Sequence, residues 1–260
     1  MLHATKPSVE IDLISEYTTV TFILSGEQNM RLGDRSFIAG GGNMLFIPFQ
    51  LPISTRFLPH AQAQFTGVSL VLDEQWLADI AARTSLLSDN VPVFGVGFDS
   101  ISPAIQDCLY RLIALLGSSS PTRHALAECY KHELALYLLE SRLKNHLLAF
   151  CNQNSQLQKI KKACHYLQVH WAEKLTVARL TELSGMGQSA FYQHFKMITG
   201  YTPLQYQKSI RLNHAKNLIL KRDLPITQIA YQVGYESANQ FSREYKRMFG
   251  TTPKEDHQAV

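Results

Sequence analysis

Two stretches near the C-terminus carry the same pattern: FYQHFKMITGYTP at residues 191–203 and FSREYKRMFGTTP at residues 241–253. They lie 50 residues apart, and aromatic residues, Lys, Gly, Thr and Pro recur in register. Each follows a shorter segment of helical spacing that ends in a turn, at Gly185 and at Gly234. A short helix, a tight turn and a second helix form a helix-turn-helix unit. The sequence therefore predicts two such units, at about residues 176–199 and 226–249.

The second helix of each unit has an apolar face and a polar face. Phe191 and Phe195 in the first helix, and Phe241 and Tyr245 in the second, follow the i, i+4 spacing of a core stripe. The residues turned outward are Gln188, Ser189, Tyr192, Gln193 and Lys196, and then Ala238, Asn239, Ser242, Arg243 and Lys246. Asn, Gln and Arg side chains pair with base edges in the major groove. A solvated helix face has the same composition, but its duplication favours DNA binding.

The charge distribution points to the same end of the chain. Residues 156–256 hold 15 Lys and Arg against 7 Asp and Glu, whereas the remaining residues hold 10 against 14. A basic module joined to a mildly acidic one indicates that only one part of the protein meets a polyanion.

The segment between the two units, residues 203–220, has the pattern of a linking helix that begins at Pro203. An 18-residue helix is about 27 Å long, on the scale of the roughly 34 Å between successive major-groove faces of B-DNA. The linking helix can thus present both units to one side of a duplex. Arg211 lies in this helix, and we favour a structural role for it over a phosphate contact.

The N-terminal part has a different pattern. Residues 9–98 contain mostly short strands and frequent turns, which predicts an antiparallel barrel or sandwich. Helical spacing follows at residues 101–117 and 126–148, and the second apolar stripe packs on its own domain or also makes a dimer contact. Aromatic residues could line an effector cavity in the barrel, although plain core is the more usual role of buried Phe. These residues are Phe22, Phe46, Phe49, Phe57 and Phe65.

The stretch ITQIAYQVGYESANQFSREYKRMFGTTP at residues 226–253 resembles the signature of the AraC family of transcription regulators. The first unit is a looser match, with Thr181 where the family usually has Ala and Gly187 where it usually has Ser. Residues 33–37 (GDRSF) and 46–52 (FIPFQLP) resemble, more weakly, the cupin-like sensing domains of this family. In the family, base contacts come from the positions that match Ser189, Tyr192, Gln193, Asn239, Gln240 and Arg243 here.

The resemblance implies an α+β protein of two domains. A cupin-like antiparallel β-barrel at residues 1–98 would sense an effector, and a helical segment at 99–150 would dimerise. A linker at 151–156 would lead to an all-α DNA-binding domain at 157–256, built of two helix-turn-helix units joined by a linker helix. The implied function is sequence-specific regulation of transcription on double-stranded promoter or operator DNA. RNA polymerase, a small-molecule effector and a second copy of the chain are the further candidate partners.

Two other classes of function are weighed against this expectation. A cupin enzyme needs two or three His and a carboxylate around a metal, but residues 1–110 contain only His3 and His60. We therefore expect no metal site, no cofactor and no enzyme. The second alternative is a protein-binding module whose basic tail meets an acidic partner.

The N-terminus has no secretory signal pattern and four scattered cysteines indicate no disulfide scaffold, so we expect a cytoplasmic protein without membrane contact. Activation is the working assignment, with repression left open.

Overall fold

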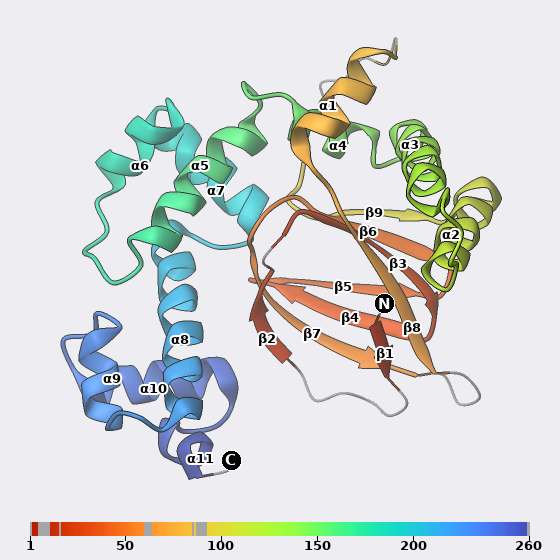
Figure 1. Cartoon of the computed structure of the whole chain (residues 1–260). Coiled ribbons are helices and arrows are strands. Elements are labelled where there is room, and N and C mark those ends of the chain that lie inside the picture. Colours follow the sequence, from red (N-terminus) through yellow and green to blue (C-terminus); the bar gives the residue numbers. More distant parts are fainter. Residues whose placement is uncertain are drawn as a thin grey trace.

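The computed structural model describes residues 2–4, 11–15, 17–59, 64–84, 86 and 93–258. The strands in this part all lie before residue 101 and build two antiparallel sheets (Figure 1). They are β1 (Leu2–Ala4), β2 (Ile11–Ile14), β3 (Thr19–Ser25), β4 (Glu27–Leu32), β5 (Arg35–Gly40), β6 (Asn43–Ile47), β7 (Pro52–Leu58), β8 (Phe65–Val71) and β9 (Gly97–Ser100).

One sheet has the strand order β1-β8-β3-β6-β9, and the other has the order β2-β7-β4-β5. Residues such as Val20 and Phe22 on β3, and Met30 and Leu32 on β4, are buried. The two sheets are not closed into a barrel, because no strand of one pairs with a strand of the other in the described part of the chain. The expected closed barrel is therefore corrected to two facing sheets, while the two-domain α+β layout is confirmed.

Helices flank the sheets and make up the rest of the chain. The N-terminal helices are α1 (Glu74–Ala82), α2 (Pro103–Leu116), α3 (Arg123–Glu140) and α4 (Lys144–Cys151). The expected continuous segment at 126–148 is divided between α3 and α4. Ser141 has an extended backbone, and its hydroxyl donates to the Leu138 carbonyl and accepts from the Leu143 N–H. Ser side chains that bond nearby backbone in this way compete with helix continuation.

The C-terminal part is helical throughout. Its helices are α5 (Gln156–Val169), α6 (Val177–Ser184), α7 (Gln188–Thr199), α8 (Pro203–Lys221), α9 (Ile226–Gln232), α10 (Ala238–Phe249) and α11 (Pro253–Gln258). Gly200 and Gly250 end α7 and α10 in the left-handed conformation, with φ of 75° and 78°. Thr202 closes a capping box at the start of α8, directly before Pro203. These local signals explain why the helices begin and end where they do.

The buried side chains form two clusters that do not coincide with the two domains. The first cluster runs from the sheets through α4 and α5 and includes Phe191 and Phe195 of α7. The second cluster is smaller, is built from α8, α9 and α10, and centres on Phe241 and Tyr245. The first helix-turn-helix unit thus shares a core with the N-terminal sheets, and the second has a core of its own.

The N-terminal sheets and the helical part are joined by a close approach of their backbones, by a hydrogen bond and by an ion pair. A Cβ atom on Gly33, in the β4–β5 turn, would lie 2.1 Å from the carbonyl oxygen of Gly200. The Tyr206 hydroxyl, at the start of α8, donates to the Gln50 carbonyl at 2.8 Å. Lys196 of α7 pairs with Asp34 at 3.5 Å. The close approach at Gly33 places the end of α7 directly on the sheet.

Candidate nucleic-acid interface

The first unit consists of α6 and α7, and α7 presents its polar face outward. Phe191, Phe195 and Ile198 are buried on the opposite side. The predicted contact residues on this helix are all exposed, namely Gln188, Ser189, Tyr192, Gln193 and Lys196. Tyr192 is only 38% exposed because its ring lies edge-on to Phe191. Lys196 forms an ion pair with Asp34 of the N-terminal domain.

The second unit consists of α9 and α10, with Phe241 and Tyr245 buried. Of its predicted contact residues, Asn239, Gln240, Arg243 and Lys246 are exposed, whereas Ala238 and Ser242 are half-buried. Ser242 donates its hydroxyl to the Ala238 carbonyl at 2.9 Å. The outward face of α10 is therefore carried mainly by the four exposed residues, which include two cations.

Ser237 fixes the start of α10. Its side chain accepts the N–H of Gln240 at 3.4 Å. Gly187 stands at the equivalent place before α7 and offers no side-chain cap. The second recognition helix consequently has the better-anchored N-terminus, which is the end of a recognition helix that contacts base edges.

Arg211 of α8 ties the segment between α5 and α6 to the turn of the second unit. Its guanidinium donates to the carbonyls of Trp171, Ala172 and Glu173, which follow α5, and to the carbonyl of Gly234, which precedes α10. The four distances lie between 2.7 and 3.1 Å. Gly234 has a φ of 82°, and a Cβ atom there would lie 2.9 Å from the guanidinium carbon. Arg211 is thus a structural cross-link, and its donors are directed at the protein.

Glu244 organises the inner side of α10. Lys208 of α8 donates to it at 2.7 Å, the Tyr235 hydroxyl at 2.9 Å and Gln240 at 3.2 Å. Burial acts to raise the pKa of the Glu244 carboxyl, but the hydrogen bonds from Lys208, Gln240 and Tyr235 outweigh it, so the pKa is lowered. Glu244 stays ionised and ties α10 to α8.

The predicted effector residues are buried in two different places: Phe57 of β7 and Phe65 of β8 contact each other between the two sheets, whereas Phe46 packs against His146 and Phe150 of α4. Phe22, Phe46 and Phe65 are fully buried, Phe49 is 5% exposed and Phe57 is half-buried. The Phe57 and Phe65 rings are tilted by 46° with centroids 4.7 Å apart, and Phe46 meets Phe150 of α4 edge-on at 6.0 Å. These rings make core contacts, and an effector site among them stays a prediction.

Sequence reasoning missed a second group of residues, where β4 and β7 face α8 and α10. Arg31, Ser209 and Arg247 belong to it. The repeat does single out Arg247. When Lys196 is aligned with Lys246, Arg247 stands where the first unit has Met197, so the second unit carries an additional cation at this position. Arg31 and Ser209 have no such signal in the sequence, because their proximity depends on how the two domains pack.

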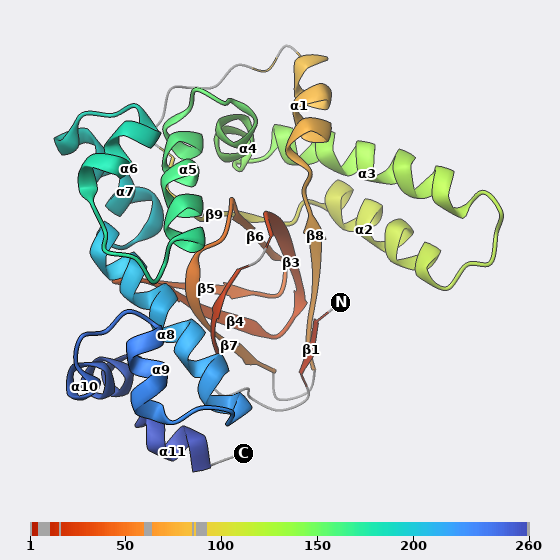
Figure 2. The same cartoon turned by 60° about the vertical axis from the view of Figure 1, so that its left-hand side comes forward.

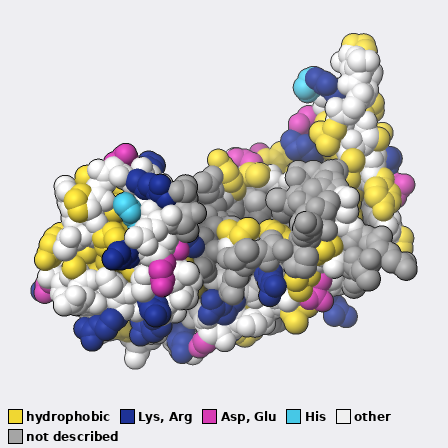
Figure 3. Space-filling view, turned by 90° about the horizontal axis from the view of Figure 1, so that it is seen from below, with side chains coloured by type: hydrophobic (Ala, Val, Ile, Leu, Met, Phe, Trp, Pro, Cys, Tyr) yellow, Lys and Arg dark blue, Asp and Glu magenta, His cyan; other side chains and the backbone are white. Residues whose placement is uncertain are grey.

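Several Lys and Arg side chains lie on the left-hand lobe in Figure 3, which is the C-terminal helical part of Figure 1. In the described part of the chain, no helix is long and apolar enough to cross a bilayer. No group of three His, Cys, Asp or Glu residues with metal-binding geometry occurs among the same residues. Two outward polar helices on a basic lobe define a helix-turn-helix DNA-binding protein.

Comparison with known proteins agrees with this class. The family model for the "AraC-type transcriptional regulator N-terminus" matches residues 1–146, and a model described as "Helix-turn-helix domain" matches residues 180–259. The chain belongs to the AraC-type family of transcriptional regulators, which confirms the resemblance carried by residues 226–253.

Curated relatives include two regulators of this kind. The chain is 24% identical over 245 residues to the HTH-type transcriptional regulator ExsA of Pseudomonas aeruginosa, covering 92% of this chain and 85% of ExsA. It is 25% identical over 180 residues to the HTH-type transcriptional activator RhaS of Salmonella schwarzengrund, covering 64% of each chain.

Among solved structures, an apo form of a ToxT variant from Vibrio cholerae matches with a TM-score of 0.60 and 11% identity, over 98% of this chain and 94% of that one. A second ToxT structure, with a bound unsaturated fatty acid, matches with a TM-score of 0.56. At this identity the likeness concerns the fold, which extends over both domains.

Proposed function

We propose that α7 and α10 read two successive major grooves of operator DNA. The observation that carries the proposal is that both helices turn exposed polar side chains outward while Arg211 and α8 hold them in one body. The 19 residues of α8 span about 28 Å at 1.5 Å per residue, close to the repeat of the major groove.

The outward residues divide by chemistry. Gln188, Ser189, Gln193, Asn239, Gln240 and Arg243 suit base edges, because amide groups match adenine and guanidinium matches guanine. Lys196 and Lys246 suit phosphates, which set register and orientation without reading sequence. Tyr192 suits a thymine methyl or the sugar-phosphate backbone, and Ala238 and Ser242 line the edge of the contact.

The N-terminal part senses an effector, dimerises the protein, or does both. Helices α2 and α3 form a hairpin that extends away from the rest of the molecule (Figure 2). On α2, Leu116 is 76% exposed and Tyr110 is 51% exposed, a pattern that suits a contact with a second copy. The regulator would act in the cytoplasm on RNA polymerase at promoters, as an activator like RhaS, without an enzymatic activity of its own.

A mobility-shift titration with DNA from upstream of the protein's own gene tests the function. Binding should survive an excess of nonspecific DNA, and its affinity should fall steeply with salt because phosphate contacts release counterions. Equal affinity for operator and random DNA would contradict sequence-specific reading. Capture of an acidic protein without any DNA shift would favour a protein-binding module.

A further inference from the structure

Gln240 is the third residue of α10, and it is exposed on the outward face of that helix. Its backbone N–H donates to the Ser237 hydroxyl at 3.4 Å, so the first turn of the helix is anchored. The N-terminal residues of a recognition helix are the ones that contact base edges. The orientation of the Gln240 amide therefore decides which bases the second unit can accept at one position.

Glu244 lies one turn further along α10 and holds the Gln240 side chain. The amide nitrogen of Gln240 donates to the Glu244 carboxylate at 3.2 Å, an i, i+4 contact along one side of the helix. An ionised carboxylate only accepts hydrogen bonds, so the NH₂ end of the amide must face it. The carbonyl oxygen of the amide then points away from Glu244, and no residue that the structure describes donates to it.

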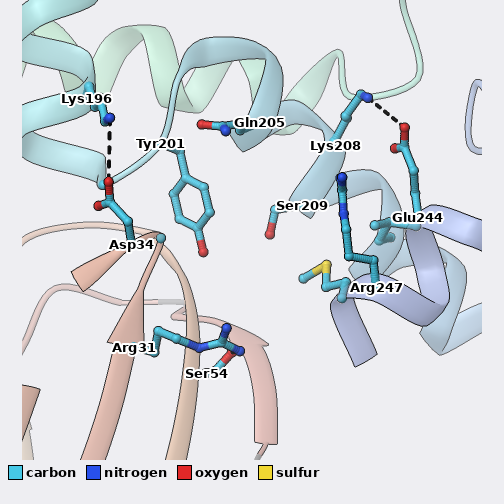
Figure 4. A pocket seen from close by; sticks show the side chains of 14 residues that line it. Arg31, Asp34, Ser54, Lys196, Tyr201, Gln205, Lys208, Ser209, Glu244 and Arg247 are labelled. Atoms are coloured by element: carbon cyan, nitrogen blue, oxygen red, sulfur yellow. Dashed lines mark hydrogen bonds and ion pairs between the residues drawn. The ribbon is translucent and has the colours of Figure 1, made fainter. Parts of the chain in front are cut away.

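Glu244 is itself held from the side of α8. Its side chain is 14% exposed, and it accepts from the Lys208 ammonium at 2.7 Å and from the Tyr235 hydroxyl at 2.9 Å. Figure 4 shows Lys208 directed at the carboxylate, and both side chains line a pocket of about 400 Å³ between the second unit and the N-terminal sheet. The acceptor for the Gln240 amide is therefore a charged group in a fixed place.

The first unit has no counterpart of this pair. At the 50-residue offset of the repeat, Ala190 and His194 stand where the second unit has Gln240 and Glu244. Gln188 and Gln193 on α7 are exposed, and neither side chain makes a hydrogen bond to a residue that the structure describes. The fixed amide is a property of the second unit.

The two ends of an amide suit different bases. In the major groove, adenine and cytosine present amino groups, whereas guanine and thymine present keto oxygens. A Gln side chain that can turn over serves either kind, because an amide has an acceptor at one end and donors at the other. A Gln whose carbonyl oxygen is held outward accepts from an amino group, and a keto oxygen in the same place would meet it acceptor to acceptor.

We propose that Glu244 sets the base preference of the second unit by fixing the Gln240 amide. At the position that Gln240 contacts, the unit selects a base with an amino group, adenine or cytosine, over one with a keto group, guanine or thymine. Glu244 is a positioning residue, since it acts through Gln240. The inference rests on the proposed function, in which α10 reads a major groove, and adds which bases α10 accepts there.

Binding of the full chain to operators with single base-pair substitutions tests the inference. Gln240→Met keeps the length of the side chain without its polar groups, so it locates the contacted base pair as the one whose preference disappears. Reversing that pair, A·T to T·A or C·G to G·C, exchanges the amino and keto groups. The reversal should weaken wild-type binding about fivefold to hundredfold, as for the loss of one base contact. Exchange of A·T for C·G should cost less.

Glu244→Gln keeps the shape of the side chain but lets the Gln240 amide turn over, so the penalty for reversing the pair should largely disappear. Asp223→Asn removes the same charge from an exposed residue between α8 and α9, and it should leave the penalty unchanged. An equal loss of affinity for every operator in Glu244→Gln, with the penalty as in the wild type, would mean a structural role alone and would overturn the inference.

A second variant covers the case in which Glu244→Gln does not fold. Lys208→Met combined with Glu244→Leu replaces the ion pair by apolar side chains, an exchange that is often neutral for stability, and leaves no lone charge behind. Its melting temperature establishes that it is folded. The penalty for reversing the pair should disappear in this variant as well, and a wild-type penalty in it would contradict the role of Glu244.

NMR spectra of the protein without DNA separate this inference from the proposed function. The side-chain amide signals of Gln240 should move in Glu244→Gln, whereas those of Gln188 and Gln193 should not. Unmoved Gln240 signals, or a wild-type preference for a keto base at its position, would overturn the inference and leave DNA binding standing. Wild-type binding without any sequence preference would contradict the proposed function, and the spectra would still report whether the amide is held.

Discussion

Phe195 and Phe241 occupy core positions in the two recognition helices, and both are fully buried. Phe195 belongs to a core that continues into the N-terminal sheets, whereas Phe241 belongs to the separate core of α8, α9 and α10. The first unit is therefore anchored to the N-terminal part by apolar packing. The second unit faces it across the pocket beside Lys208 and Glu244. The two copies of the duplicated pattern are therefore attached to the N-terminal part in two different ways.

The largest expected effect distinguishes the two cores directly. Phe195→Ala and Phe241→Ala should each lower the free energy of unfolding of their own core by about 3–5 kcal/mol. Hydrogen exchange, read segment by segment, should show loss of protection in the sheets and α7 for the first variant, and in α9 and α10 alone for the second. Loss of protection across the whole chain in both variants would mean that the two cores unfold as one.

Arg211→Met tests the cross-link between the α5–α6 segment and the second unit. Four carbonyl groups lose a charged donor, and the partly exposed ones regain water, so we expect a loss of about 2–3 kcal/mol in unfolding free energy. DNA affinity should fall further than stability alone explains, because the two recognition helices lose their fixed relation. Chemical denaturation and mobility shifts on the same preparations compare the two losses. Unchanged stability would contradict the structural role of Arg211.

Arg243→Ala and Gln193→Ala compare the two reading faces. Each should cost about 1–3 kcal/mol of binding free energy at one base pair and relax the preference there. Binding to a panel of operators with single substitutions locates the affected positions, which should fall in different halves of the site. A uniform loss across the panel would reassign the residue to a phosphate contact.

The smallest effect concerns the helix N-termini. Ser237→Ala removes the cap of α10 and should cost about 0.5–2 kcal/mol. Gly187→Ser adds a cap to α7, where the backbone is already extended with ψ of 152°, and should gain a few tenths of a kcal/mol. Thermal unfolding of both variants beside the wild type measures the difference. Destabilisation by Gly187→Ser would show that the two N-termini are not equivalent.

Local signals in the sequence were sufficient for the helical half. The repeat, the glycines after α7 and α10, and Pro203 all predict features that the structure has. The bounds of β7 could not be read from local pattern, because its first residue is Pro52, which is tolerated at the start of a strand but resembles a break. The closed barrel was wrong because sheet closure depends on pairing between distant strands.

Contacts to backbone atoms, together with the packing of elements far apart in the sequence, account for the rest of what the sequence did not reveal. The partners of Arg211 are carbonyl groups, which every residue possesses, so no side-chain pattern marks them. Arg31, Ser209 and Arg247 meet only because α8 and α10 pack beside β4 and β7. Such groupings follow from tertiary packing and have no local spacing to recognise.

Under the proposed function, the cross-link that Arg211 makes between the α5–α6 segment and the second unit also bears on the spacing of the DNA sites. B-DNA completes a turn in about 10–10.5 base pairs, so each inserted base pair rotates one binding box by about 34–36° relative to the other. A rigid pair of readers cannot follow that rotation. If α7 and α10 read DNA as proposed, target sites keep their two boxes at one separation, and insertion of about five base pairs carries the second box to the opposite side of the duplex.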